Sequence, residues 1–159
     1  MAKSFVLNQN KNQKQHIMKN LFLSSMLLMT VAIANAQNEE EAIRESIQLY
    51  IDGSSYSDPE KIVAPFYEDA RMFLFHKEQP IYLLSPAEYA ALFKKREKGK
   101  FNGRVGKILS VDQENDIALA KAEIVIDAGA MRFIDLFILK KLEGEWKIIS
   151  KAATLMPGE

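Results

Sequence analysis

The chain has 159 residues, of which 48% are hydrophobic, with 21 basic and 21 acidic residues and no cysteine. A chain of this length can bury a core of its own, and without cysteine that core must be held by packing rather than by disulfides. The lack of cysteine also excludes a lipid-anchored lipoprotein of the bacterial type.

Residues 18–36 have the pattern of a secretory signal peptide. Lys19 supplies the positive charge, Leu21–Ala34 the apolar run, and Ala34-Asn35-Ala36 a cleavage site of the small-x-small kind. The apolar run is shorter than the ~20 residues that span a bilayer. We therefore expect cleavage after Ala36, so that residues 1–36 are an N-terminal extension and signal peptide.

The remaining chain, residues 37–159, is expected to be one domain that works in the periplasm or outside a bacterial cell. Cleavage removes four lysines and no acidic residue, which leaves 17 basic and 21 acidic residues and a net charge of about −4. This charge disfavours nucleic acid and anionic lipid as partners. After cleavage we expect no attachment to a membrane.

Two helices are predicted at the start of the domain. Glu39–Asp52 has apolar residues at helical spacing, and acidic residues crowd its first turn, where the helix dipole favours them. Gly53-Ser54-Ser55 is expected to end this helix. Ser57-Asp58-Pro59 then offers a capping residue before a proline, which predicts a short second helix through about Ala64.

A hairpin and a third helix follow. Ala70–Phe75 and Pro80–Leu84 are short, rich in β-forming residues and joined by a polar turn. Ser85 has a glutamate, Glu88, three residues after it, as a capping box requires. The third helix is expected to run from there to about Lys98.

Four strands separated by hairpin-sized polar turns complete the domain. They are Val105–Asp112, Ile117–Asp127, Met131–Lys141 and Trp146–Thr154. The second strand alternates apolar even positions with an odd face that carries Lys121 and Glu123, so one face of the sheet is core and the other meets water or a second subunit. The order ααββαββββ predicts an α+β fold in which a curved, mostly antiparallel sheet wraps three helices.

This order and several short motifs resemble the nuclear transport factor 2-like superfamily. The motifs are Tyr50, Ser57-Asp58-Pro59, Phe66 with Glu68-Asp69-Ala70, and Gly144-Glu145-Trp146-Lys147-Ile148. From about Glu41 to Ala153 the chain is most similar to the bacterial putative lumazine-binding family. The resemblance implies a cone-shaped half-barrel with an apolar pocket between helices and sheet, and a homodimer formed through the outer sheet face. Enzymes, binding proteins and dimerisation modules all use this fold, so the fold does not decide the function.

The resemblance also provides a test for one enzymatic mechanism. Ketosteroid isomerases of the superfamily place a tyrosine on the first helix, a base carboxylate on the first strand and a carboxylic acid on a late strand. Tyr50 corresponds to the tyrosine and Asp135 to the acid, but the base position falls on Leu74. Leucine cannot accept a proton, so the isomerase mechanism is not carried over.

Asp135 is the candidate acid or base of the domain. It shares its strand face with Phe133 and Phe137, which predicts apolar surroundings. An unpaired charge there would cost several kcal/mol. We therefore expect Asp135 to be protonated, paired with Arg71 or Lys151, or in contact with water in the pocket. A ligand-facing role and a structural ion pair are both open.

Aromatic residues gather on the elements that would line the pocket. The candidate ligand-binding residues are Tyr50, Phe66, Phe73, Phe75, Tyr82, Phe133, Asp135 and Phe137. Tyr50 is also open to a core position with its hydroxyl at the rim. No metal site is expected, because cleavage leaves His76 as the only histidine. The glycines around Arg104 lack the spacing of a nucleotide-binding motif, so no cofactor is expected either.

Three functions are compatible with this sequence. The first is an exported, non-catalytic binding domain whose pocket takes a small aromatic or apolar molecule, for example a lumazine-like ring, with Asp135 and Tyr50 orienting it. The second is a lyase- or isomerase-type enzyme that uses Asp135 as its acid or base. The third is a dimeric interaction module whose pocket is filled by its own side chains. The leucine at the base position favours the first and the third.

Overall fold

The computed structural model of the protein describes residues 38–158. The predicted signal peptide and its cleavage site lie outside these residues. The contacts divide the chain into two units, Met1–Glu39 and Glu40–Glu159, and the sheet belongs to the second. Among the helices of residues 38–158, none has the length and apolar character needed to cross a membrane.

The first helix spans residues 38–55 and therefore ends three residues later than predicted. Gly53-Ser54-Ser55 does not end it, because all three residues are buried and held by tertiary contacts. The side-chain amide of Asn102 donates to the Ser54 carbonyl at 2.7 Å, which satisfies one of the free carbonyls at the helix end. The second helix, α2, spans Pro59–Val63, and the Asp58 side chain caps it by accepting from two backbone N–H groups, as expected.

The hairpin and the third helix are present with different lengths. Strands β1 (Phe66–Leu74) and β2 (Tyr82–Leu84) pair antiparallel. Helix α3 covers only Pro86–Ala91, and its predicted capping box between Ser85 and Glu88 is formed. Beyond Ala91 the chain continues as turns rather than as a helix.

The four late strands are found close to their predicted bounds. They are β3 (Val105–Glu114), β4 (Ile117–Ile126), β5 (Met131–Leu142) and β6 (Glu145–Leu155). Each pairs antiparallel with the next, while β6 also pairs parallel with β1. The sheet order is therefore β2-β1-β6-β5-β4-β3, which confirms the predicted α+β fold with a mostly antiparallel sheet.

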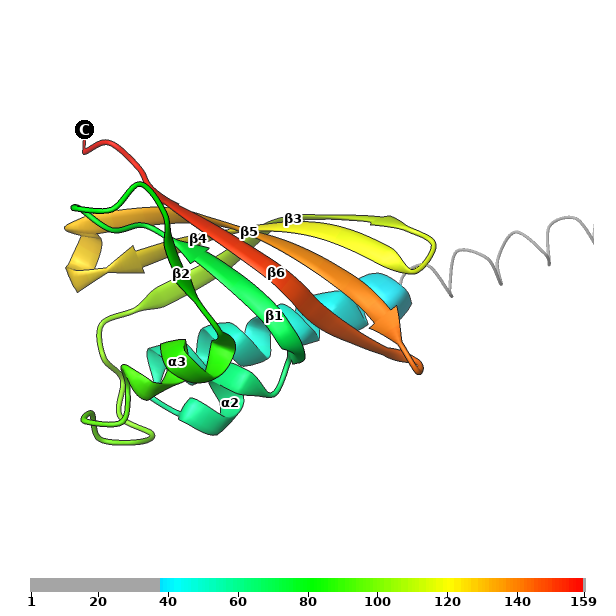
Figure 1. The fold of residues 1–159 in the computed structure, drawn as a ribbon, viewed down its shortest axis with the longest axis horizontal. Helices are drawn as coiled ribbons and strands as arrows, with labels where there is room; N and C mark the ends of the chain where they lie inside the picture. The colour runs from blue at the N-terminus through cyan, green and yellow to red at the C-terminus, as the bar shows by residue number, and fades with distance from the viewer. Residues whose placement is uncertain (1–37, 159) are drawn as a thin grey trace, which may run out of the picture. The chain divides into compact units, whose positions relative to one another are not determined.

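The helices lie together on one face of the curved, unclosed sheet (Figure 1). Ile43, Ile47 and Ile51 of the first helix are buried, a spacing that turns one helix face towards the sheet. The facing residues of β4 are mostly small, with Ala118, Ala120 and Ala122 among those buried, so the helix can lie close to the strand. This packing forms the core and leaves a cavity at the end of the sheet near α3.

Candidate functional site

A cavity of about 210 Å³ lies between the inner face of the sheet and the chain around α3. Most of its wall is apolar or aromatic: Leu74, Phe75, Tyr82, Leu92, Ile126, Phe133 and Ala153. The remaining lining residues are polar: Tyr89, Arg104, Asp135 and Lys151. They come from α3, the segment before β3, and strands β5 and β6.

An ion pair between Asp135 and Lys151 is buried beside this cavity. Each side chain is only 1% exposed, and Lys151 Nζ lies 2.8 Å from Asp135 Oδ2. This oxygen forms no hydrogen bond of normal geometry to the described residues, so the contact is an ion pair and not an aligned hydrogen bond. Lys151 Nζ also lies 5.5 Å from the centre of the Tyr50 ring, within the range of a cation–π interaction.

A β-bulge directs Lys151 into the core. Leu139 pairs with Ile148, but the next pair is Ile138 with Ser150, so β6 carries one extra residue here. Before the bulge the even positions of β6 are buried, as Ile148 shows, whereas after it the buried position is Lys151. Bulges are known to redirect side chains next to functional sites. In regular strand alternation Lys151 would face outward, away from Asp135.

Two tyrosine hydroxyls lie close to the ion pair. The Tyr50 hydroxyl donates to the Tyr89 hydroxyl over 3.4 Å, and both side chains are buried. Burial raises the pKa of Tyr50 and of Tyr89 well above the ordinary value for tyrosine. Both phenols therefore stay neutral at physiological pH and act as hydrogen-bond donors and acceptors rather than as anions.

Arg104 supplies a second positive charge to the cavity wall. The backbone N–H of Arg104 donates to the Asn102 side chain at 3.2 Å, which fixes the chain just before β3. Burial works against the guanidinium charge, but nearby Tyr89, Tyr50 and Asp135 favour it and the pKa of Arg104 is raised. Its Nε is buried and has no hydrogen-bond partner among the described residues.

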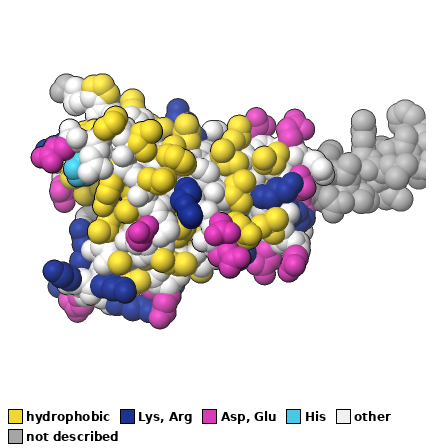
Figure 2. Space-filling model, in the orientation of Figure 1, with side chains coloured by type: hydrophobic (Ala, Val, Ile, Leu, Met, Phe, Trp, Pro, Cys, Tyr) yellow, Lys and Arg dark blue, Asp and Glu magenta, His cyan; other side chains and the backbone are white. Residues whose placement is uncertain are grey.

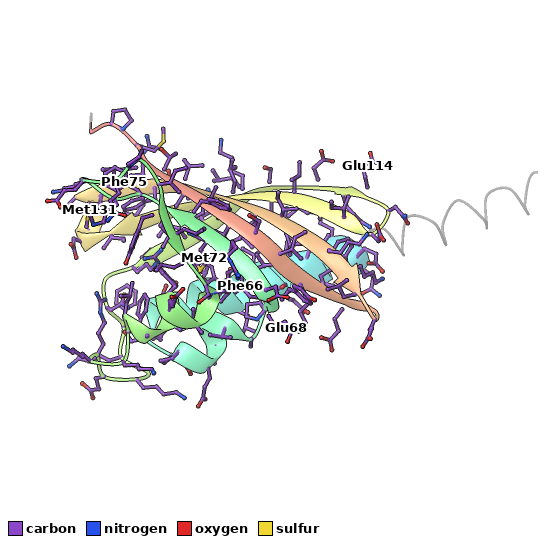
Figure 3. The ribbon with its side chains drawn as sticks, viewed as in Figure 1. Phe66, Glu68, Met72, Phe75, Glu114 and Met131 are labelled. Carbon is purple, nitrogen blue, oxygen red and sulfur yellow. The ribbon has the colours of Figure 1, made fainter. Side chains whose placement is uncertain are left out.

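Four of the eight predicted site residues line the cavity: Phe75, Tyr82, Phe133 and Asp135. Tyr50, Phe66 and Phe137 do not line it but form the core behind it, with the Tyr50 ring centre 5.5 Å from that of Phe66 and 5.7 Å from that of Phe137. Figure 3 shows Phe75 at one end of the sheet near Met131, with Phe66 further along beside the helices.

The prediction that Phe73 lines the pocket is wrong. Successive side chains of a strand point to opposite faces, and the cavity takes Leu74 from the inner face of β1. Phe73 lies on the outer face instead and is 42% exposed. The prediction rested on the presence of aromatic residues in β1 and did not separate the two faces of the strand.

The wall offers limited chemistry. Of the described residues that line the cavity, Asp135 alone carries a carboxylate, and Lys151 holds it. Leu74, which the resemblance to ketosteroid isomerases puts at the base position, lines the cavity, and the described wall provides no second carboxylate. The arrangement can therefore bind and orient a molecule through its tyrosine, arginine and ion pair, but it lacks a pair of separate acid and base groups.

Three polar residues of the wall, Tyr89, Arg104 and Lys151, were not predicted as site residues, although Lys151 was expected as a possible partner of Asp135. Tyr89 is a buried residue of α3, and its sequence neighbours do not indicate that it lines a cavity. Arg104 precedes a strand in a glycine-containing segment, where no periodicity indicates the direction of its side chain. A usable signal was the predicted position of Asp135 among apolar residues, since a buried acid calls for nearby cations.

Residues 38–152 match the sequence profile of a family described as putative lumazine-binding. This match covers well over half of the chain. Among curated proteins, no significant match is found.

Several solved structures share the fold. A nuclear transport factor 2-like protein of unknown function from Shewanella baltica is 22% identical, with a TM-score of 0.66 over 76% of this chain and 96% of that chain. A similar protein from Silicibacter pomeroyi is 21% identical, with a TM-score of 0.67 over 76% and 98%. A ketosteroid isomerase-like protein from Erwinia carotovora atroseptica is 15% identical, with a TM-score of 0.54 over 74% and 96%. At these identities the likeness establishes the fold alone.

Proposed function

Because the chain belongs to the putative lumazine-binding family, within the nuclear transport factor 2-like superfamily, we propose that it is an exported, non-catalytic domain that binds a small aromatic or apolar molecule. The observation that carries this proposal is the cavity of about 210 Å³, whose wall is largely apolar or aromatic and includes three charged residues, Arg104, Asp135 and Lys151. Small-molecule sites typically combine a mostly apolar wall with a few placed polar groups. Export rests on the signal-peptide pattern of residues 18–36.

The size of the cavity limits the ligand. Its 210 Å³ lies below the ~300–1,000 Å³ of sites for drug-sized molecules. It exceeds the ~150 Å³ of an engineered apolar cavity that binds benzene. A ligand of one ring or two fused rings, such as lumazine itself, fits this range better than a ring system with a long side chain.

The enzymatic alternative has less support. Asp135 would have to act as both acid and base, and Lys151 lies 2.8 Å from its carboxylate. An enzyme that moves a proton between two carbon atoms needs a base within reach of the substrate, and the resemblance puts that base at Leu74, which lines the cavity. The alternative of a filled pocket is disfavoured by the cavity itself.

The binding role can be tested with two neighbouring alanines on opposite faces of β6. Ala153 lines the cavity, whereas Ala152 is exposed on the outer face. The probes are lumazine and indole, with dissociation constants measured by calorimetry. We expect wild type to bind at least one of them, Ala153→Phe to lose that binding because the new ring fills the cavity, and Ala152→Phe to keep it.

Two results would contradict the binding role. If neither probe binds the wild-type protein, the cavity does not capture small aromatic molecules. If Ala153→Phe binds as tightly as Ala152→Phe, the probe occupies another part of the molecule. Melting curves of both variants serve as the control that each is folded.

A further inference from the structure

The charged residues of the cavity wall do not balance. Three of the described lining residues are charged, namely Arg104, Lys151 and Asp135. Lys151 and Asp135 lie 2.8 Å apart and neutralise each other. Within residues 38–158, no carboxylate lies within 4 Å of the Arg104 guanidinium to pair with it. One positive charge is therefore left over in the cavity wall.

The surrounding polar groups do not supply the missing negative charge. The hydroxyls of Tyr89 and Tyr50 lie near Arg104, but both are buried phenols that stay neutral at physiological pH. Burying a guanidinium in apolar surroundings costs free energy if no counter-charge is present. Each buried donor without a hydrogen bond adds to that cost. The buried, unpartnered Nε of Arg104 is such an unmade bond.

The chemistry of arginine indicates which counter-charge would suit. Its planar group donates two parallel N–H bonds to a carboxylate, and such charge-assisted pairs are stronger than bonds between neutral groups. Much of the remaining wall is aromatic, and the rings of Phe75 and Phe133 pack with their centres 6.3 Å apart. A ligand that suits both Arg104 and the aromatic side chains would carry a ring and one negative group.

We infer that the cavity selects a small anionic aromatic molecule, in the simplest case a single ring with one carboxylate, whose negative group pairs with Arg104 while its ring lies among the aromatic side chains. This inference rests on the proposed binding role and names the class of ligand for the same cavity. It assigns Arg104 as the residue that sets specificity. The Lys151–Asp135 pair then serves as scaffold for the polar end rather than as the anion site.

The test compares benzoate with benzamide, which has the same shape and no charge. We expect wild type to bind benzoate at least about tenfold more tightly than benzamide at pH 7, because a charge-assisted bond replaces a neutral one. Acetate, a carboxylate without a ring, should bind far more weakly than benzoate. This comparison needs no variant, so it does not depend on how a substitution affects folding.

A pair of arginine variants then locates the charge. Arg104→Gln should weaken benzoate binding about tenfold or more and leave benzamide within about threefold. The matched control is Arg71→Gln, because Arg71 is exposed on β1 and donates to the carbonyls of Asp69 and Ala70 rather than to the cavity. It should leave both affinities unchanged.

The outcomes separate this inference from the binding role. Benzamide that binds as tightly as benzoate would overturn the selection of anions and leave a neutral binding pocket. Equal loss of both probes in Arg104→Gln would overturn the assignment of Arg104 as the specificity residue. Failure of benzoate, benzamide, indole and lumazine alike would overturn the binding role, and the inference with it.

Discussion

Asp135 and Lys151 form a buried ion pair whose main effect on stability lies in what happens when one partner is lost. Removing two charges from water is costly, and an intact buried pair often contributes little in net terms. Removing one partner leaves the other charge buried and uncompensated. Lys151 would keep only its contacts with the rings of Tyr50 and Phe137.

We therefore expect Asp135→Leu to lower the free energy of unfolding by about 3–5 kcal/mol, because it strands Lys151. The double variant Asp135→Leu with Lys151→Met should recover most of that loss, since it removes both charges. Urea unfolding measures all three proteins. Asp112→Leu, at an exposed position of β3, is the control and should stay within about 0.5 kcal/mol of wild type.

A single variant as stable as the control would show that the two groups do not interact. A double variant with a lower free energy of unfolding than Asp135→Leu would show that the ion pair stabilises the protein more than the apolar side chains that replace it.

The residue-level predictions succeeded where a short pattern was sufficient. Asp135 could be placed among apolar neighbours because strand alternation is local, and Lys151 was one of two proposed partners. Arg71, the other, lies on the outer face and is exposed. The choice between them depends on the bulge in β6, which appears only in the pairing of strands. Arg104 reaches the cavity from an irregular segment, where no periodicity fixes the direction of a side chain.

At the level of elements, the contact between the first helix and α2 depends on Gly53. A Cβ built there would lie 2.6 Å from the backbone nitrogen of Ile62 and 2.8 Å from the carbonyl carbon of Lys61. Backbone atoms cannot move aside as the end of a side chain can. Glycine is thus required by the close approach of the two helices, although it is a poor helix former.

Gly53→Ala gives opposite expectations for propensity and packing. Helix propensity alone would stabilise the protein by up to about 1 kcal/mol. The clash with the Ile62 backbone should outweigh this and give a net loss of about 1–3 kcal/mol. Urea midpoints of Gly53→Ala and of Gly158→Ala, where a Cβ meets nothing within 4 Å, measure the difference. A Gly53→Ala protein more stable than wild type would show that the helices separate freely.

The bounds of most elements could be predicted, and the exceptions share a physical cause. Helix α3 was expected to run from its capping box to about Lys98. Instead, Lys98 forms ion pairs with Asp58 and Glu60, and the Gly99 N–H donates to the Tyr56 carbonyl. These tertiary contacts override the propensity of the segment. The order of elements was confirmed because each turn and cap is encoded locally.

At the level of the whole molecule, the outer face of the sheet exposes an apolar patch. Phe73 pairs with Leu83 and with Ala152, and Ala152 pairs with Leu136, so these side chains form a row across four strands. Figure 2 shows hydrophobic side chains gathered over this part of the sheet, interrupted by single charged residues. Contiguous exposed apolar patches often mark interfaces between proteins.

We propose that two copies pair through this face, and we expect sedimentation to show a dimer at tens of micromolar. Leu136→Glu should give a monomer, because Leu136 is exposed within the row and a charge there would be buried on pairing. Leu49→Glu, at an exposed position of the first helix, is the control and should remain dimeric. Wild-type protein that sediments as a monomer at this concentration would contradict the proposal.

Export gives a prediction for the whole chain. We propose that the protein isolated from its native host begins at Gln37, and intact mass measures this directly. Ala36→Lys should block processing, because the cleavage site requires a small residue. Recovery of the unprocessed chain from the cytoplasm as the main wild-type species would refute the proposal.

The place of β6 in the sheet has a consequence for the timing of folding. β6 is the last strand in sequence, yet it lies between β1 and β5 and is the sole strand of the described sheet that joins the β1–β2 pair to the β3–β5 meander. In a growing chain that lacks β6, the β1–β2 pair and the β3–β5 meander are separate sheets, β1 and β5 each lack a neighbour, and Asp135 has no Lys151. Long-range pairings of this kind form late and slowly. A folded domain could therefore form only after β6 has been made, and this delay would suit the export that we propose.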